Sequence, residues 1–426
     1  MKLLLNPPRS EWKALCERPA SRDAAVREVA AGILERVRRE RDKALKELSA
    51  EIDGWTPESL EVSREEIDSA CAAVSEKLKA AIRKAASNIR AFHEAQMPHT
   101  IEVETSPGVV CSQRPVPIDS VGLYVPGGTA PLFSTVLMLA VPAAIAGCRE
   151  VVLCTPAGRE GKVAPAVLYA ASLCGVKRIF KTGGAQAIAA MALGTESIPK
   201  VDKIFGPGNA YVTAAKQLVA GSLVSVDMPA GPSEVMVLAD SETNPRFAAA
   251  DLLSQAEHGK DSQSMLLASG KEVAEAVCSE VERRVKELPR SALALSSLGH
   301  SLAIVFEDRQ DMIDFAETYA PEHLIISTSD ADSVCEKISA AGSVFVGAYT
   351  PESAGDYASG TNHTLPTSGW ARSCSGVNLE SFMRRMTVQR ISREGLAGLS
   401  DTIIEMAEAE GLRAHADAVR IRLDDN

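Results

Sequence analysis

Hydrophobic residues recur along this chain in two different patterns. Between about residues 22 and 96 they come at helical spacing within segments rich in Ala, Glu, Lys and Arg, which predicts amphipathic helices. From there on, short apolar runs around Val121, Val151, Ile179 and Ile204 each end in a turn and lead into an Ala-rich segment. Runs repeated at roughly 25 to 30 residues are typical of successive βα units in a parallel sheet.

A second set of strands and helices follows. The runs SMLLAS, SLAIVFE, HLIIST and SVFVGA predict strands, with helices over KEVAEAVCSEVERRVKEL, RQDMIDFAETYA and DADSVCEKISAAG between them. We therefore expect an α/β fold with two doubly wound, incomplete Rossmann-like domains, one inserted in the other. The expected division is an N-terminal arm over 1–24, a first domain over 25–120 and 235–377, an inserted domain over 121–234, and a helical tail over 378–426. The many charges of the tail predict that it packs outside its own domain.

The composition excludes several classes of partner. A chain of 426 residues with 46% hydrophobic and 24% charged residues is typical of a globular protein with more than one domain. The net charge of -11 argues against nucleic acid or an anionic membrane as the main partner. Nine cysteines without a C-x-x-C pair predict reduced thiols. Without a signal-peptide core or a membrane-spanning apolar run, we expect a cytoplasmic protein.

Glycine-rich turns follow the strands of the inserted domain. Each lies between a strand and a helix, where free backbone N–H groups and the helix dipole favour phosphate. The turn Gly206-Pro207-Gly208-Asn209 approaches the G-x-G-x-x-G pattern, but the sixth position is Tyr211 and no acidic residue stands at the expected ribose distance. Tight turns alone also produce such loops. Four of them at one edge of a sheet favour a ligand cleft.

The stretch AAADLLSQAEHGK, residues 248–260, predicts a helix that places Gln255 and His258 on one side. An amide oxygen beside an imidazole nitrogen can begin a metal site, but further ligands must come from elsewhere. A helix-capping histidine beside a solvated glutamine explains the same pair.

Other polar segments offer acid–base groups and ligands. The pair Glu322-His323, between a helix and a strand, can supply two proton-transfer groups, although taken alone such a pair is more often a helix-end salt pair. A polar loop over 350–367 adds three further groups, namely Glu352, Asp356 and His363. Its aspartate suits a cation such as zinc, while an Asx-turn would explain it as well. His415 lies five positions after Glu410 on the C-terminal helix, a spacing that by itself favours a solvated face.

Eight strings, taken together, resemble the ordered motifs of the histidinol dehydrogenase family. They are GLYVPGG, GGAQAIAA, GPGNAYV, DMPAGPSEV, LLSQAEHG, APEHL, ESAGDYASGTNHTLPT and AEAEGLRAH. The resemblance runs from about residue 25 to the C-terminus. It implies the last step of histidine biosynthesis, in which L-histidinol is oxidised through L-histidinaldehyde to L-histidine with two NAD⁺. It also implies a homodimer with shared active sites and one zinc ion per subunit.

The resemblance carries over residue by residue. The zinc ligands that it implies are Gln255, His258, Asp356 and His415. The acid–base pair that it implies consists of Glu322 and His323. The residues expected to contact NAD are Tyr124, Gln186 and Asn209. The residues expected to contact the substrate are Ser233, Gln255, His258, His323, Asp356, His363, Glu410 and His415.

Two other classes of function stand beside this one. A zinc hydrolase would use Glu322 or Glu257 as the base for metal-bound water and would leave the glycine loops and Asn209 without a purpose. A non-catalytic nucleotide-binding or assembly protein would keep the sheets and helices. It would leave the Glu-His pair and the ligand candidates unexplained.

Overall fold

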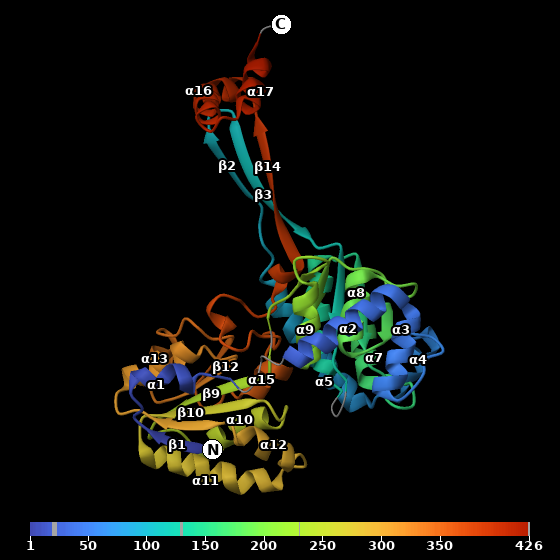
Figure 1. Cartoon of the computed structure of the whole chain (residues 1–426). Coiled ribbons are helices and arrows are strands. Elements are labelled where there is room, and N and C mark those ends of the chain that lie inside the picture. Colours follow the sequence, from blue (N-terminus) through green and yellow to red (C-terminus); the bar gives the residue numbers. More distant parts are fainter. Residues whose placement is uncertain (19–23, 128–130, 230, 425–426) are drawn as a thin grey trace.

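Two parallel sheets, each flanked by helices, make up the body of the protein, and an antiparallel stalk projects away from both (Figure 1). The structure is a computed structural model and describes residues 1–18, 24–127, 131–229 and 231–424. Among these residues, none of the helices combines the length and the hydropathy needed to span a membrane. All nine cysteines lie in the described part and carry free thiols.

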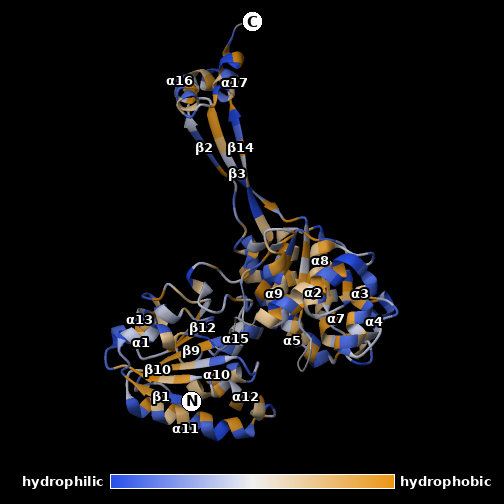
Figure 2. Ribbon diagram, in the orientation of Figure 1, coloured by the Kyte–Doolittle hydropathy of each residue, from blue (hydrophilic) through white to orange (hydrophobic). Residues whose placement is uncertain are grey.

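The larger sheet has six parallel strands in the order β1-β11-β10-β9-β12-β13. Its strands are β1 (Lys2–Leu5), β9 (Glu234–Ala239), β10 (Gln263–Ala268), β11 (Leu302–Val305), β12 (His323–Ser327) and β13 (Ser343–Val346). One face packs on α10 (Pro245–Ala256), α11 (Lys271–Arg284) and α12 (Ser291–Leu298), and the other on α1 (Arg9–Leu15), α13 (Arg309–Tyr319) and α14 (Ala331–Cys335). Hydrophobic residues dominate β9 and β10 but alternate with hydrophilic ones along α11 (Figure 2). A strand covered on both faces needs apolar side chains throughout.

The smaller sheet has five parallel strands in the order β6-β5-β4-β7-β8. Its strands are β4 (Ser120–Tyr124), β5 (Glu150–Thr155), β6 (Arg178–Lys181), β7 (Lys203–Phe205) and β8 (Ser225–Val226). The helices between them are α6 (Phe133–Ala146), α7 (Pro165–Leu173), α8 (Gly184–Leu193) and α9 (Ala210–Val219). Counted along the chain from β4, and from β9 in the larger sheet, both have the order 3-2-1-4-5. This is the doubly wound pattern, so the predicted α/β fold is confirmed.

The packing differs in two places from the division expected from the sequence. Strand β1 belongs to the expected N-terminal arm over 1–24, yet it forms the edge of the larger sheet; residues 19–23 of that arm lie outside the described part. The helices α2 (Ala24–Glu40), α3 (Asp42–Leu48), α4 (Arg64–Ala73) and α5 (Glu76–Glu94) pack on the smaller sheet, not on the larger one. Helical periodicity reveals an apolar face but not the sheet that covers it.

The stalk consists of the antiparallel strands β2 (Ile101–Ser106), β3 (Val109–Pro117) and β14 (Met383–Ile391) and the helices α16 (Arg393–Ala409) and α17 (Arg413–Leu423). The sequence patterns did not predict this sheet, because β3 and β14 pair across more than 260 residues and carry many polar side chains. The expected single helix of the tail is two helices. Gly411, with a φ of +74°, stands between them.

Candidate functional site

A cavity lies where the two sheets face each other. It is lined from the smaller sheet by residues that follow β4, β7 and β8, which are Leu132, Ser134, Thr135, Gly206, Pro207, Asp227 and Met228. From the side of the larger sheet it is lined by Gly231, Ser233, Gln255, His258, Glu322, His323, Asp356, Tyr357, His363, Thr364, Leu365 and Thr367. The carboxyl ends of β4 and β7 are the point where the strand order of the smaller sheet reverses. Such switch points are the usual ligand crevice of doubly wound sheets.

The predicted acid–base pair stands at the start of β12, with both side chains buried. The Nδ1 atom of His323 lies 3.0 Å from the backbone oxygen of Glu234. Because a carbonyl oxygen only accepts, Nδ1 carries a hydrogen, and Nε2 is the atom that can gain or lose a proton. The backbone N–H of Glu234 donates to Oε2 of Glu322 at 2.8 Å. The backbone N–H and C=O groups of one residue on β9 therefore orient both members of the pair.

Three carboxyl groups surround this imidazole. Oxygens of Glu322 and Glu352 lie 3.6 and 3.8 Å from Nδ1 of His323, and Oδ1 of Asp356 lies 3.6 Å from Nε2. Burial raises the pKa of Glu322 and the pKa of Glu352 to about 8 each. Burial by itself would lower the pKa of His323, but the three carboxylates raise it well above its usual range. When ionised, the three carboxylates outnumber the single imidazolium in a largely buried place, so a cation would stabilise their charged forms.

The residues at this place fit a divalent metal ion. Ligand atoms of His258, Glu352 and Asp356 all lie within 4.8 Å of one another. Gln255 is buried, and among the described residues neither its amide oxygen nor its nitrogen has a hydrogen-bond partner. Nitrogen and oxygen donors of this kind suit zinc. Glu352 is not among the ligands that the resemblance implies. Its spacing of four from Asp356 places both residues on one face of α15 (Glu352–Tyr357).

The helix expected over 248–260 begins and ends earlier in the chain than the sequence implied. Helix α10 ends at Ala256, so Gln255 lies in its last turn and His258 lies beyond its end. Both residues nevertheless line the cavity. The backbone N–H of His258 still donates to the backbone oxygen of Gln255 at 3.1 Å, which continues the turn of the helix.

Two of the expected substrate-contacting residues also line the cavity. Ser233 directly precedes β9. His363 has its Nδ1 atom 2.9 Å from the backbone oxygen of Asp356 and its Nε2 atom 3.2 Å from Oγ1 of Thr135. Burial lowers the pKa of His363. We therefore interpret it as a neutral side chain that ties the loop after α15 to helix α6.

The expected NAD-contacting residues gather at the carboxyl edge of the smaller sheet, next to the cavity but not among its lining residues. The hydroxyl oxygen of Tyr124, at the end of β4, accepts a hydrogen bond from the backbone N–H of Gly184 at 3.1 Å, and burial raises the pKa of Tyr124 to about 12. Gln186 is buried at the start of α8 with its amide nitrogen unpaired among the described residues. Asn209 is the N-cap of α9 and accepts two of its backbone N–H groups. Residues 128–130, at the end of the first glycine-rich turn, lie outside the described part.

Glu410 and His415 do not join the cavity within one chain. His415 lies on α17 and Glu410 directly follows α16, and both are exposed. Figure 1 places these helices at the far end of the stalk, away from the two sheets. The structure therefore brings together three of the four ligands implied by the sequence, and it adds Glu352.

Comparisons with known proteins agree over the whole chain. A family model described as histidinol dehydrogenase matches residues 16–423. The histidinol dehydrogenase of Bacteroides thetaiotaomicron is 54% identical over 424 residues, which cover 100% of this chain and 99% of that protein. That of Escherichia coli strain K12 is 52% identical over 417 residues, covering 97% and 95%. The crystal structure of histidinol dehydrogenase from Elizabethkingia anophelis matches with a TM-score of 0.96 at 49% identity, covering 99% of this chain and 98% of that one. The resemblance read from the motifs is thus confirmed, and the chain belongs to the histidinol dehydrogenase family of oxidoreductases.

Proposed function

We propose that this protein oxidises L-histidinol through L-histidinaldehyde to L-histidine with two molecules of NAD⁺, and that the cavity between the two sheets is the active site. The observation that carries this proposal is the Glu322-His323 pair, oriented by the backbone of one residue of β9, beside a set of metal-ligating groups. A zinc hydrolase and a non-catalytic protein are set aside, because neither accords with membership of a dehydrogenase family.

His323 is the base of the first oxidation. Its Nδ1–H group is held by the backbone oxygen of Glu234, so in the neutral side chain the Nε2 atom takes the proton of the substrate hydroxyl. Bound NAD⁺ supplies the acceptor for the two electrons and the hydrogen that leave the carbon atom. After Nε2 has released this proton to solvent, it serves again in the second oxidation, when it takes a proton from the hydrated aldehyde.

Glu322 is the base that hydrates the aldehyde. One of its oxygens accepts the N–H group of Glu234 at 2.8 Å, and the other, which has no hydrogen bond from the described residues, would accept from a water molecule. This oxygen takes a proton from the water as the water adds to the aldehyde carbon. The burial that raises the pKa of Glu322 to about 8 also makes its carboxylate a stronger base near neutral pH.

A zinc ion would be held by Gln255, His258 and Asp356, with Glu352 as a further candidate ligand. When bound, the ion supplies a fixed positive centre that grips the substrate and keeps the aldehyde from escaping. Ser233 and His363, at the wall of the same cavity, would orient the substrate from the other side.

The cofactor would lie along the carboxyl edge of the smaller sheet. Tyr124, Gln186 and Asn209 stand there, at the beginnings of α8 and α9 and at the end of β4. Gly206 has a φ of +129°, and a Cβ atom at this position would collide with the backbone oxygen of Tyr124. The backbone of Gly206 therefore lies close to that of Tyr124 at the crevice, with no side chain between them. Such a close approach of backbone is typical of a crevice that binds an extended nucleotide.

The stalk would complete the active site of a second subunit. Its helices expose large hydrophobic side chains, among them Met406, Leu412 and Ile421, with exposed fractions of 60%, 44% and 70%. A homodimer with shared sites would bury this surface and bring Glu410 and His415 of one chain to the cavity of the other. This arrangement would supply His415, the one ligand implied by the resemblance that does not reach the cavity of its own chain.

The test is NADH formation by the purified, zinc-loaded protein given L-histidinol and NAD⁺, with NADH and histidine both quantified. We expect about two NADH per histidine, loss of activity on chelation and recovery with added zinc. Asp356→Asn serves as the matched control, since it keeps the fold and removes a charged ligand. Absence of NADH under these conditions would refute the proposal.

A further inference from the structure

Glu234 is the residue that connects the acid–base pair to the rest of the protein. Its backbone N–H donates to Glu322 and its backbone oxygen receives Nδ1–H of His323. Its own side chain is not directed at the substrate cavity, because Glu234 is absent from the lining residues. The carboxylate is 1% exposed, so it needs a partner inside the protein.

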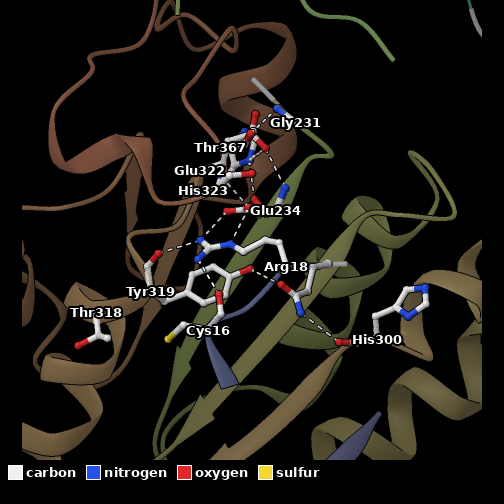
Figure 3. A network of polar contacts seen from close by, with 12 residues as sticks. Cys16, Arg18, Gly231, Glu234, His300, Thr318, Tyr319, Glu322, His323 and Thr367 are labelled. Carbon is white, nitrogen blue, oxygen red and sulfur yellow. Dashed lines mark hydrogen bonds and ion pairs between the residues drawn. The ribbon is translucent and has the colours of Figure 1, made fainter. Parts of the chain in front are cut away.

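That partner is Arg18, which lies 216 positions earlier in the chain. Its Nε and Nη2 atoms donate to the two oxygens of Glu234 at 2.9 and 3.0 Å, a bidentate pair with fixed geometry. Ser368 adds its backbone N–H at 2.8 Å to the same carboxylate. Three hydrogen bonds therefore hold this side chain, and Figure 3 shows Glu234 and Arg18 below Glu322 and His323.

Arg18 is itself held in place on every side. Its remaining N–H groups donate to the backbone oxygens of Cys16 at 2.9 Å and Tyr319 at 2.7 Å. The guanidinium carbon lies 3.6 Å from the centre of the Tyr319 ring, whose hydroxyl donates to Gln263 of β10 at 2.6 Å. A planar group that stacks on a ring and bonds in two directions has one position only.

We propose that Arg18 is a positioning residue for catalysis, which acts through Glu234 to set the orientation of both Glu322 and His323. We call this unit the Arg18–Glu234 clamp. The inference rests on the proposed roles of the acid–base pair. It gives the N-terminal segment a task in the reaction, although Arg18 touches neither the cavity nor any metal-ligating residue.

The consequence of weakening the clamp follows from its connections. If the carboxylate of Glu234 moves, the backbone on both sides of its Cα atom moves with it, and both catalytic side chains lose their anchor together. A displacement of about 1 Å in an active site can lower the rate about a hundredfold. Substrate and zinc binding should change less, because the cavity residues that would provide them do not contact Arg18.

The test is Arg18→Lys in the full-length, zinc-loaded enzyme. Lysine keeps the charge but cannot make the bidentate, stacked arrangement. We expect kcat to fall by about 10-fold to 100-fold in both half-reactions, with L-histidinol or L-histidinaldehyde as substrate, while KM and zinc content stay within about threefold.

Arg9→Lys is the matched control. Arg9 also lies in the N-terminal segment, pairs with two carboxylates, Asp311 and Asp314, and stacks over an aromatic ring, that of Trp12 at 4.8 Å. Its side chain is 60% exposed and contacts no residue of the cavity. We expect its kcat to stay within about twofold of the wild-type value.

A second variant separates positioning from stability. Arg18→Met combined with Glu234→Gln removes both buried charges, so we expect its thermal unfolding midpoint to recover relative to Arg18→Met alone. Its kcat should stay low, since the bidentate anchor is still missing. Wild-type kcat in zinc-loaded Arg18→Lys, or recovery of kcat together with stability in the double variant, would overturn the proposal. Failure of the wild-type protein to oxidise L-histidinol would instead refute the proposed function.

Discussion

Replacement of Glu322 by glutamine should separate the two oxidations. The amide oxygen of glutamine can still accept the backbone N–H of Glu234, which lies 2.8 Å from the carboxylate, so the shape of the site is kept and only the proton acceptor is lost. A general base contributes about 100-fold to 10,000-fold to a rate. We expect a loss of this size in the oxidation of L-histidinaldehyde, where Glu322 would activate water.

The first oxidation should suffer much less. It depends on Nε2 of His323, and the missing charge lies 3.6 Å from the opposite nitrogen. Loss of that charge lowers the pKa of His323, which makes it a somewhat weaker base, and a decrease of about tenfold or less is expected. The assay follows NADH with each of the two substrates in turn. Equal losses in both half-reactions would refute the role of Glu322. The reference variant is His323→Asn, which should impair both half-reactions.

The pH dependence gives a second test of the same residue. Because burial raises the pKa of Glu322 to about 8, the group is protonated below that pH and cannot act as a base. Aldehyde oxidation by the wild-type protein should therefore rise with pH through about 8. In Glu322→Gln this rise should disappear, and an unchanged profile would contradict the assignment.

The remaining predictions concern stability, metal binding and subunit sharing. Burial raises the pKa of Asp251 to about 6, so the contribution of this carboxyl group to the stability of the fold is present below about pH 4 and lost as the pH rises through 6. Asp251→Asn should therefore add about 1–3 kcal/mol to the free energy of unfolding at pH 7 and nothing at pH 3.5, as measured by urea denaturation. Zinc affinity should fall as the pH drops below about 8, because burial raises the pKa of Glu352 to about 8 and a ligand must lose its proton; calorimetric titration should show a flatter dependence for Glu352→Gln. Mixed dimers of His415→Asn and Asp356→Asn should recover about one quarter of wild-type activity, since half the dimers are hybrids with one intact site; no recovery would contradict shared sites.

The sequence by itself determined the layered α/β core and most of the chemical groups. The apolar runs of β9 and β10 have no polar face, and such strands are stable only between two layers of helices. Glycine-rich turns marked the carboxyl edge of the smaller sheet. The ordered motifs located Gln255, His258 and the Glu322-His323 pair, because these residues lie in short segments whose local pattern is specific.

Only the tertiary structure decided which distant segments meet. The pairing of β3 with β14 and the packing of α2–α5 on the smaller sheet depend on contacts that no local periodicity encodes. The same holds for Arg18 and Glu234, which are an ordinary arginine and glutamate in the sequence and become a buried bidentate pair only when β9 lies beside the N-terminal segment. Local patterns follow from the chain's own geometry, whereas long-range contacts follow from the burial of whole surfaces against one another.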